Sequence, residues 1–170
     1  MQLKILGAFL VIAGCGGWGL LIANGYRKQE ALLRKLTNLL RTMQWELRYR
    51  LTSLPELCQM AARDSSGILR EVFRDLAKEL ESRSESEAGA CMTAVLNRYD
   101  TLPPKVRRIL RHLGRNLGRF DLEGQLEGMS CVIGECRQEL QNLSKDKQLR
   151  IRNYQTLTLC AGFALVILFL

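Results

Sequence analysis

Two apolar segments decide the architecture of this chain: ILGAFLVIAGCGGWGLLIA (residues 5–23) and TLTLCAGFALVILFL (residues 156–170). Neither contains a charged residue, whereas the sequence between them holds all of the acidic and nearly all of the basic side chains. A helix needs roughly 20 apolar residues to cross the bilayer core, and the first segment meets this requirement. The second is about 22 Å long as a helix, so it must recruit Ile151 and Tyr154 or thin the bilayer locally. The sequence therefore predicts transmembrane helices at 4–24 and 155–170 that flank one soluble domain at 25–154.

Basic residues flank both segments on the side of the middle domain. The formal net charge is +8, and Lys4 is the only basic side chain before the first apolar segment. Basic residues near the ends of spans stay in the cytoplasm, where anionic lipid holds them. We therefore expect a cell-membrane protein with both termini outside and the middle domain in the cytoplasm. The flanking residues are Arg27, Lys28, Arg34, Lys35 and Arg41 after the first segment, and Lys145, Lys147, Arg150 and Arg152 before the second.

A second interpretation of the N-terminal segment stays open. Ile12-Ala13-Gly14-Cys15 resembles a bacterial lipobox, in which Cys15 would be the acylated residue of a lipid-anchored envelope protein. The apolar run continues beyond Cys15 through Trp18 and Ile22, which favours an uncleaved span. The lipoprotein alternative would also place the basic middle domain outside the cell, against the charge of its flanks.

The residue content argues against catalytic and metal chemistry. The chain has six cysteines, but none forms a C-x-x-C motif, and Cys131 and Cys136 lie about 140° apart on a helix. The cysteines of the cytoplasmic domain are expected to be reduced and to act as small buried hydrophobic residues. His112 lies among arginines without an obvious carboxylate partner, and no phosphate-binding loop is present. The sequence predicts no enzymatic activity and no cofactor.

The soluble domain is predicted to be all-α, because apolar residues recur at helical spacing throughout it. We expect a bundle of about six helices in which the first and last run antiparallel, since both leave the same membrane face. Pro103 and Pro104 should open one of the shorter helices, and no proline interrupts the pattern from Asp121 to Leu170. The clearest apolar stripes are Leu32, Leu36, Leu39, Met43 and Leu47; Leu69, Val72, Phe73, Leu76 and Leu80; and Leu122, Leu126, Met129, Ile133, Cys136, Leu140 and Leu143.

Several positions carry local signals for helix ends and close packing. Ser53 and Glu56 have the spacing of a reciprocal capping box. Gly118 is placed to end a helix with a positive φ, and Asp121 to cap the next helix. Gly124 and Gly128 form a small-residue patch that would let another helix approach closely.

A basic run with no acidic residue between Asp100 and Asp121 is the most specific functional signal. Arg107, Arg111 and Arg115 fall on one face of the predicted helix. Such a face is either simply solvated or a docking surface for an acidic protein. Nucleic acid is not expected as a partner, because few aromatic residues interleave and no nucleic-acid motif is present. The run comprises Lys105, Arg107, Arg108, Arg111, Arg115 and Arg119.

Two motifs resemble a known family. They are Leu113-Gly114-x-x-Leu117-Gly118-x-x-Asp121-x-x-x-Gln125, and Trp45-Glu46-Leu47-x-Tyr49 followed by Leu54-Pro55-x-Leu57. Their order and spacing resemble the stage III sporulation protein AB family of endospore-forming bacteria, although Ser53-Leu54-Pro55 stands where that family usually has Thr-Pro-Leu. The resemblance covers nearly the whole chain. The positions that carry it are Glu46, Gly114, Gly118, Asp121 and Gln125.

The resemblance implies a role that composition does not show. Members of the family belong to an envelope-spanning complex that joins mother cell and forespore, so the expected location is the mother-cell membrane facing the forespore. Their soluble domain is similar to that of the inner-membrane platform protein of type II secretion and type IV pili. The implied partners are the companion stage III sporulation AA ATPase and other subunits of the complex. A homo-oligomer is also compatible with this role.

Overall fold

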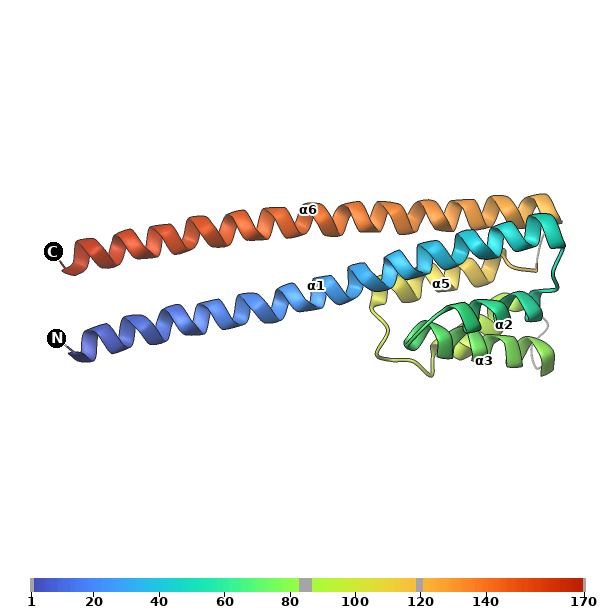
Figure 1. Cartoon of the computed structure of the whole chain (residues 1–170), viewed down its shortest axis with the longest axis horizontal. Coiled ribbons are helices and arrows are strands. Elements are labelled where there is room, and N and C mark those ends of the chain that lie inside the picture. The colour runs from blue at the N-terminus through green and yellow to red at the C-terminus, as the bar shows by residue number, and fades with distance from the viewer. Residues whose placement is uncertain (1, 83–86, 119–120, 170) are drawn as a thin grey trace. The chain divides into compact units, whose positions relative to one another are not determined.

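The computed structural model describes the backbone of residues 2–82, 87–118 and 121–169, and the side chains of residue 25 and of residues 27–82, 87–118 and 121–145. Within these ranges every regular element is an α-helix, which confirms the predicted all-α class. The helices are α1 (Gln2–Arg50), α2 (Leu54–Asp64), α3 (Ile68–Ser82), α4 (Ala88–Leu96), α5 (Pro104–Asn116) and α6 (Leu122–Phe169) (Figure 1).

The chain divides into two compact units. Unit 2 comprises Ala31–Leu140, and unit 1 comprises Met1–Glu30 together with Gln141–Leu170. The predicted spans at 4–24 and 155–170 fall in unit 1, and their side chains, including Cys15, lie outside the described residues. Among the side chains that are described, no helical stretch has the length and apolarity needed to cross a membrane. The spans and the limits of the 25–154 domain therefore stay predictions.

Within unit 2, α1 and α6 run antiparallel, as expected from the sequence (Figure 1). Gln44 of α1 donates from Nε2 to the backbone oxygen of Leu126 at 3.1 Å and to Oγ of Ser130 at 2.6 Å. Most of the apolar residues predicted for these two helices are buried and form one side of the core, but Leu122 is exposed and Leu32 and Leu140 are half-buried. Buried members are Leu33, Leu36, Leu40, Met43 and Leu47 from α1, and Leu126, Met129, Val132, Ile133 and Cys136 from α6.

The start of α2 corrects one expectation. Leu51, with a φ of 50°, turns the chain between α1 and α2, and Ser53 occupies the N-cap position of α2. The reciprocal capping box with Glu56 is not formed, because the Ser53 side chain makes no capping hydrogen bond. Both side chains are exposed, so water can satisfy the first-turn amide groups instead. Leu57 still donates its backbone N–H to the Ser53 carbonyl at 2.8 Å.

The short helices complete the core with the apolar side chains of their buried faces. Phe73 of α3, Met92 of α4 and Ile109 of α5 are each at most 1% exposed. α4 ends at Leu96, so Tyr99 lies in the turn that follows. Pro103 is the N-cap of α5 and Pro104 its first residue, as the sequence predicts. Unit 2 is thus a packed helical bundle that presents α5 beside α4 and α6.

A candidate docking surface on α5 and the corner that follows it

Helix α5 has one buried face and one cationic face. Its buried residues recur at helical spacing, which places them together against the rest of the bundle. The cationic residues occupy the remaining positions, but they differ in how much they are exposed and in what they contact. The buried set is Val106, Ile109, Leu110, Leu113 and Gly114.

Arg107 is a structural residue rather than an exposed one. Its side chain is only 26% exposed, and its Nη2 donates to the Tyr99 carbonyl oxygen at 2.8 Å. The same nitrogen lies 3.3 Å from Oδ1 of Asp100. Arg107 therefore holds the loop before α5 against the helix. Of the three arginines that the sequence places on one helix face, Arg107 and Arg111 are therefore half-buried and Arg115 is exposed.

Two further basic residues of α5 are engaged by carboxylates of α6. Lys105 forms an ion pair with Glu139, whose side chain is only 8% exposed. His112 lies with Nδ1 at 2.7 Å from Oε1 of Glu135, so the histidine does have a carboxylate partner, contrary to the sequence analysis. The sequence does not reveal either contact, because the paired residues are more than 20 positions apart and belong to separate helices. These contacts tie α5 to α6 and hold Lys105 and His112 against carboxylates within unit 2.

The cations that remain available form a smaller surface. Arg108 and Arg115 are exposed, and Arg111 is half-buried, with its Nε lacking a hydrogen-bond partner. Residues at i, i+3 and i+7 share one side of a helix, so these three arginines lie together. The lining of an open pocket on this side includes Arg107, Arg108 and Arg111 together with Asp100. We call Arg108, Arg111 and Arg115 the α5 arginine face.

A tight corner follows the α5 arginine face. Gly114 lies so close to α4 that a Cβ atom added to it would meet Cβ of Met92 at 2.5 Å and Cγ at 2.8 Å. Gly118 has a φ of 76°, which confirms that the chain turns there in the left-handed region. Asp121 accepts a hydrogen bond from the backbone N–H of Gly124 at 3.0 Å, which confirms it as the cap of α6. Gly114, Gly118 and Asp121 thus fix how α5 leads into α6.

The small-residue patch on α6 is used inside the bundle. A Cβ atom on Gly128 would meet Cβ of Asn116 at 2.7 Å, so Gly128 allows the end of α5 to approach α6. This confirms the expected close approach at Gly128 and identifies α5 as the neighbouring helix.

The cysteines behave as packing residues more than as reactive groups. Cys58, Cys91 and Cys136 are buried, as expected, but Cys131 is exposed. Burial raises the pKa of the Cys58 thiol to about 12 and that of Cys136 to about 11, so both stay protonated at neutral pH. Across the described side chains, no three metal-ligating residues gather at one point.

Comparison with known proteins identifies the family. A family model described as stage III sporulation protein AB matches residues 4–170, which is nearly the whole chain. The chain belongs to the stage III sporulation protein AB family. Stage III sporulation protein AB of Bacillus subtilis (strain 168) is 22% identical over 169 residues, and the match covers 98% of this chain and 99% of that relative. A solved structure of a stage III sporulation protein AB has a TM-score of 0.64 and 18% identity, over 72% of this chain and 98% of that one, which shows a shared fold.

The other two positions that carry the resemblance to the stage III sporulation protein AB family lie on α1 and at the start of α6. Glu46 is buried in α1, with its Oε2 at 3.5 Å from Nε of Arg50 on the next turn. Gln125 is half-buried in the first turn of α6 and donates its backbone N–H to the Asp121 carbonyl at 3.0 Å. The motif residues Gly114, Gly118 and Asp121 lie at the corner between α5 and α6, and Arg115 of the α5 arginine face lies between the first two.

Proposed function

We propose that this chain is a non-enzymatic membrane platform subunit of the sporulation complex that joins mother cell and forespore. Unit 2 lies in the cytoplasm of the mother cell, and the α5 arginine face docks the companion stage III sporulation AA ATPase. Family membership supports a role in sporulation. The single observation that supports docking through α5 is the exposure of Arg108 and Arg115 beside Arg111, in a stretch without any acidic residue from 101 to 120.

The physical basis of the proposal is charge complementarity. Exposed charges at the rim of an interface mainly raise the association rate and exclude wrong partners, and salt weakens them over about 8 Å at physiological ionic strength. Lys105, Arg107 and His112 already have partners within unit 2, so they contribute to folding and not to docking. The α5 arginine face is therefore where an acidic surface of the ATPase would be steered.

Charge reversal tests the docking surface. We expect the variant Arg108→Glu/Arg111→Glu/Arg115→Glu to reduce co-purification of the companion ATPase at least about tenfold, because repulsion replaces attraction at the contact. Circular dichroism should show unchanged helix content. Since Arg111 is half-buried, the double variant Arg108→Glu/Arg115→Glu serves as a second test on exposed residues alone. Undiminished capture by either folded variant would move the docking site elsewhere.

Labelling of Cys131 tests the topology. Cys131 is exposed on α6. A membrane-impermeant maleimide should therefore label it whenever the reagent is on the same side of the membrane as unit 2. We expect labelling that depends on Cys131 only after cells are permeabilised, with Cys131→Ala as the matched control. Labelling of Cys131 in intact cells would place unit 2 outside the cytoplasm, as the lipid-anchored alternative requires, and would contradict the proposal.

A further inference from the structure

A second cationic surface lies in an open groove between α2 and α3, which pack against each other (Figure 1). Ala62 of α2 and Ala77 of α3 contribute small, buried side chains to it. Its basic residues come from both helices and are exposed. They are Arg63 from α2 and Arg70, Arg74 and Lys78 from α3, and we call this set the α2–α3 basic groove.

The sequence hides this groove because acidic residues alternate with its cations. Glu71, Asp75 and Glu79 follow Arg70, Arg74 and Lys78 directly, so the local net charge is close to zero. The helix separates the two signs, because residues at i and i+1 point about 100° apart. The cations at 70, 74 and 78 repeat every four residues and share one side of α3. The adjacent acids repeat in the same way and share another.

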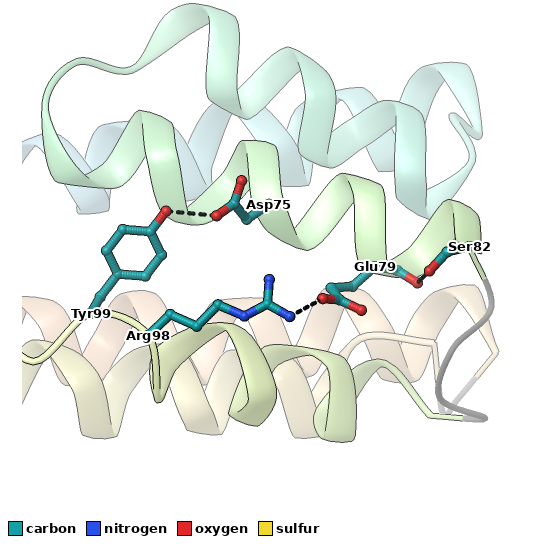
Figure 2. A network of polar contacts seen from close by, with 5 residues as sticks. All are labelled: Asp75, Glu79, Ser82, Arg98 and Tyr99. Carbon is teal, nitrogen blue, oxygen red and sulfur yellow. Dashed lines mark hydrogen bonds and ion pairs between the residues drawn. The ribbon is translucent and has the colours of Figure 1, made fainter.

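Two of the three acidic residues on the other side of α3 have partners in the turn after α4. Tyr99 donates its hydroxyl to Oδ2 of Asp75 at 2.7 Å, and Arg98 forms an ion pair with Glu79 (Figure 2). Burial, together with the hydrogen bond to Asp75, raises the pKa of Tyr99 to about 12, so the phenol remains a donor at neutral pH. Two acids of α3 are thus satisfied by the turn after α4, on the side away from the groove lining.

The cations on the basic side have few carboxylate partners among the described residues. In the part of the chain that the structure describes, Arg63 and Lys78 form no ion pair. Arg70 donates its Nε to the Ser65 carbonyl at 2.9 Å, and Nε of Arg74 is 3.9 Å from its neighbour Asp75. The acid that lines the groove, Glu81, accepts a hydrogen bond from Gln59. The groove therefore holds four cations against one carboxylate.

We propose that the α2–α3 basic groove binds an acidic helical segment of a partner protein. The cations of α3 recur about every 6 Å, which matches carboxylates at i and i+4 on a second helix. This surface is on different helices from the α5 arginine face, and the inference does not rest on docking of the ATPase.

Fluorescence anisotropy with a designed peptide tests the groove. The probe is a labelled alanine-based helical peptide with glutamates at four-residue intervals, and its glutamine counterpart is the control ligand. We expect the full-length chain in neutral detergent to bind only the glutamate peptide, with affinity that falls as salt rises. The variant Arg70→Glu/Arg74→Glu/Lys78→Glu should bind at least about tenfold more weakly.

Matched variants separate the groove from net charge and from misfolding. Arg41→Glu/Arg48→Glu/Arg137→Glu changes the net charge equally, at exposed sites outside both the groove and the α5 arginine face, and should keep wild-type affinity for the peptide. The milder pair Arg63→Gln/Lys78→Gln, at residues without ion-pair partners, should weaken binding several-fold while circular dichroism stays unchanged. ATPase capture by the groove variant should be normal, so failure of one proposal does not imply failure of the other.

Three results would overturn the proposal. The first is that the wild-type chain binds the glutamate peptide and the glutamine peptide equally well. The second is that the groove variants bind the glutamate peptide with full affinity. The third is that phosphatidylglycerol vesicles displace the bound peptide and phosphatidylcholine vesicles do not. That result would assign the groove to anionic lipid headgroups.

Discussion

Gly114→Ala should destabilise unit 2 by about 1–3 kcal/mol, although alanine is the better helix former. The new methyl group would lie 2.5 Å from Cβ of Met92, and a Cβ atom cannot rotate away as the end of a flexible side chain could. The α4–α5 contact must therefore separate or tilt. The measurement is the free energy of unfolding of the full-length chain in detergent, together with hydrogen exchange of the α5 amides.

Gly134→Ala is the matched control for this substitution. Gly134 lies inside α6, is exposed, and has no atom within 4 Å of the position that a Cβ would occupy. Alanine should therefore stabilise the helix there by about 0.5–1 kcal/mol. Opposite signs at Gly114 and Gly134 would attribute the loss to the contact with Met92. An equal gain at both positions would contradict the close packing of α4 and α5.

Lys105→Ala should destabilise the chain by about 1–3 kcal/mol, because it leaves the Glu139 carboxylate buried without its cation. The Lys105 side chain is 43% exposed, so solvent screens the pair and the loss should fall below the range for fully buried pairs. Arg108→Ala, on the exposed side of the same helix, should change stability by less than about 0.5 kcal/mol. Chemical denaturation of the three proteins measures both differences.

A double variant separates the pair from the packing of the lysine. Lys105→Ala/Glu139→Leu removes both charges and should recover most of the stability that Lys105→Ala loses, since an apolar residue replaces the unpaired carboxylate. Additive losses in the double variant would show that Glu139 does not depend on Lys105. The account of why Lys105 is unavailable to a partner would then be wrong.

Local sequence signals predicted the helices and the corner well. The proline pair at Pro103, the positive φ at Gly118 and the cap at Asp121 depend on the residue itself and its near neighbours, so the chain's own propensities determine them. The apolar stripes likewise predicted the core of α1 and α6, because burial of such a stripe is the main source of helix stability in a bundle.

Contacts between helices distant in sequence could not be predicted in the same way. In the sequence, nothing distinguishes the basic residues between 105 and 119 from one another. In the structure, Lys105 and His112 contact carboxylates of α6, and Arg107 donates a hydrogen bond to the Tyr99 carbonyl. The α2–α3 basic groove was missed for the converse reason, because its cations alternate with acids along α3. Which charges remain for a partner is decided by tertiary packing, and no pattern within one helix records it.

Binding of the companion ATPase by two charge-reversed variants, measured side by side, tests the central claim most directly. Equilibrium dissociation constants would be determined for the full-length chain, for Arg108→Glu/Arg111→Glu/Arg115→Glu, and for Arg70→Glu/Arg74→Glu/Lys78→Glu, which changes the net charge equally. The account predicts that charge reversal on α5 weakens binding of the ATPase at least about tenfold, and that this loss of affinity grows as the salt concentration falls. Charge reversal in the groove should leave the dissociation constant unchanged. Equal affinity of the wild-type chain and the α5 variant for the ATPase would contradict it.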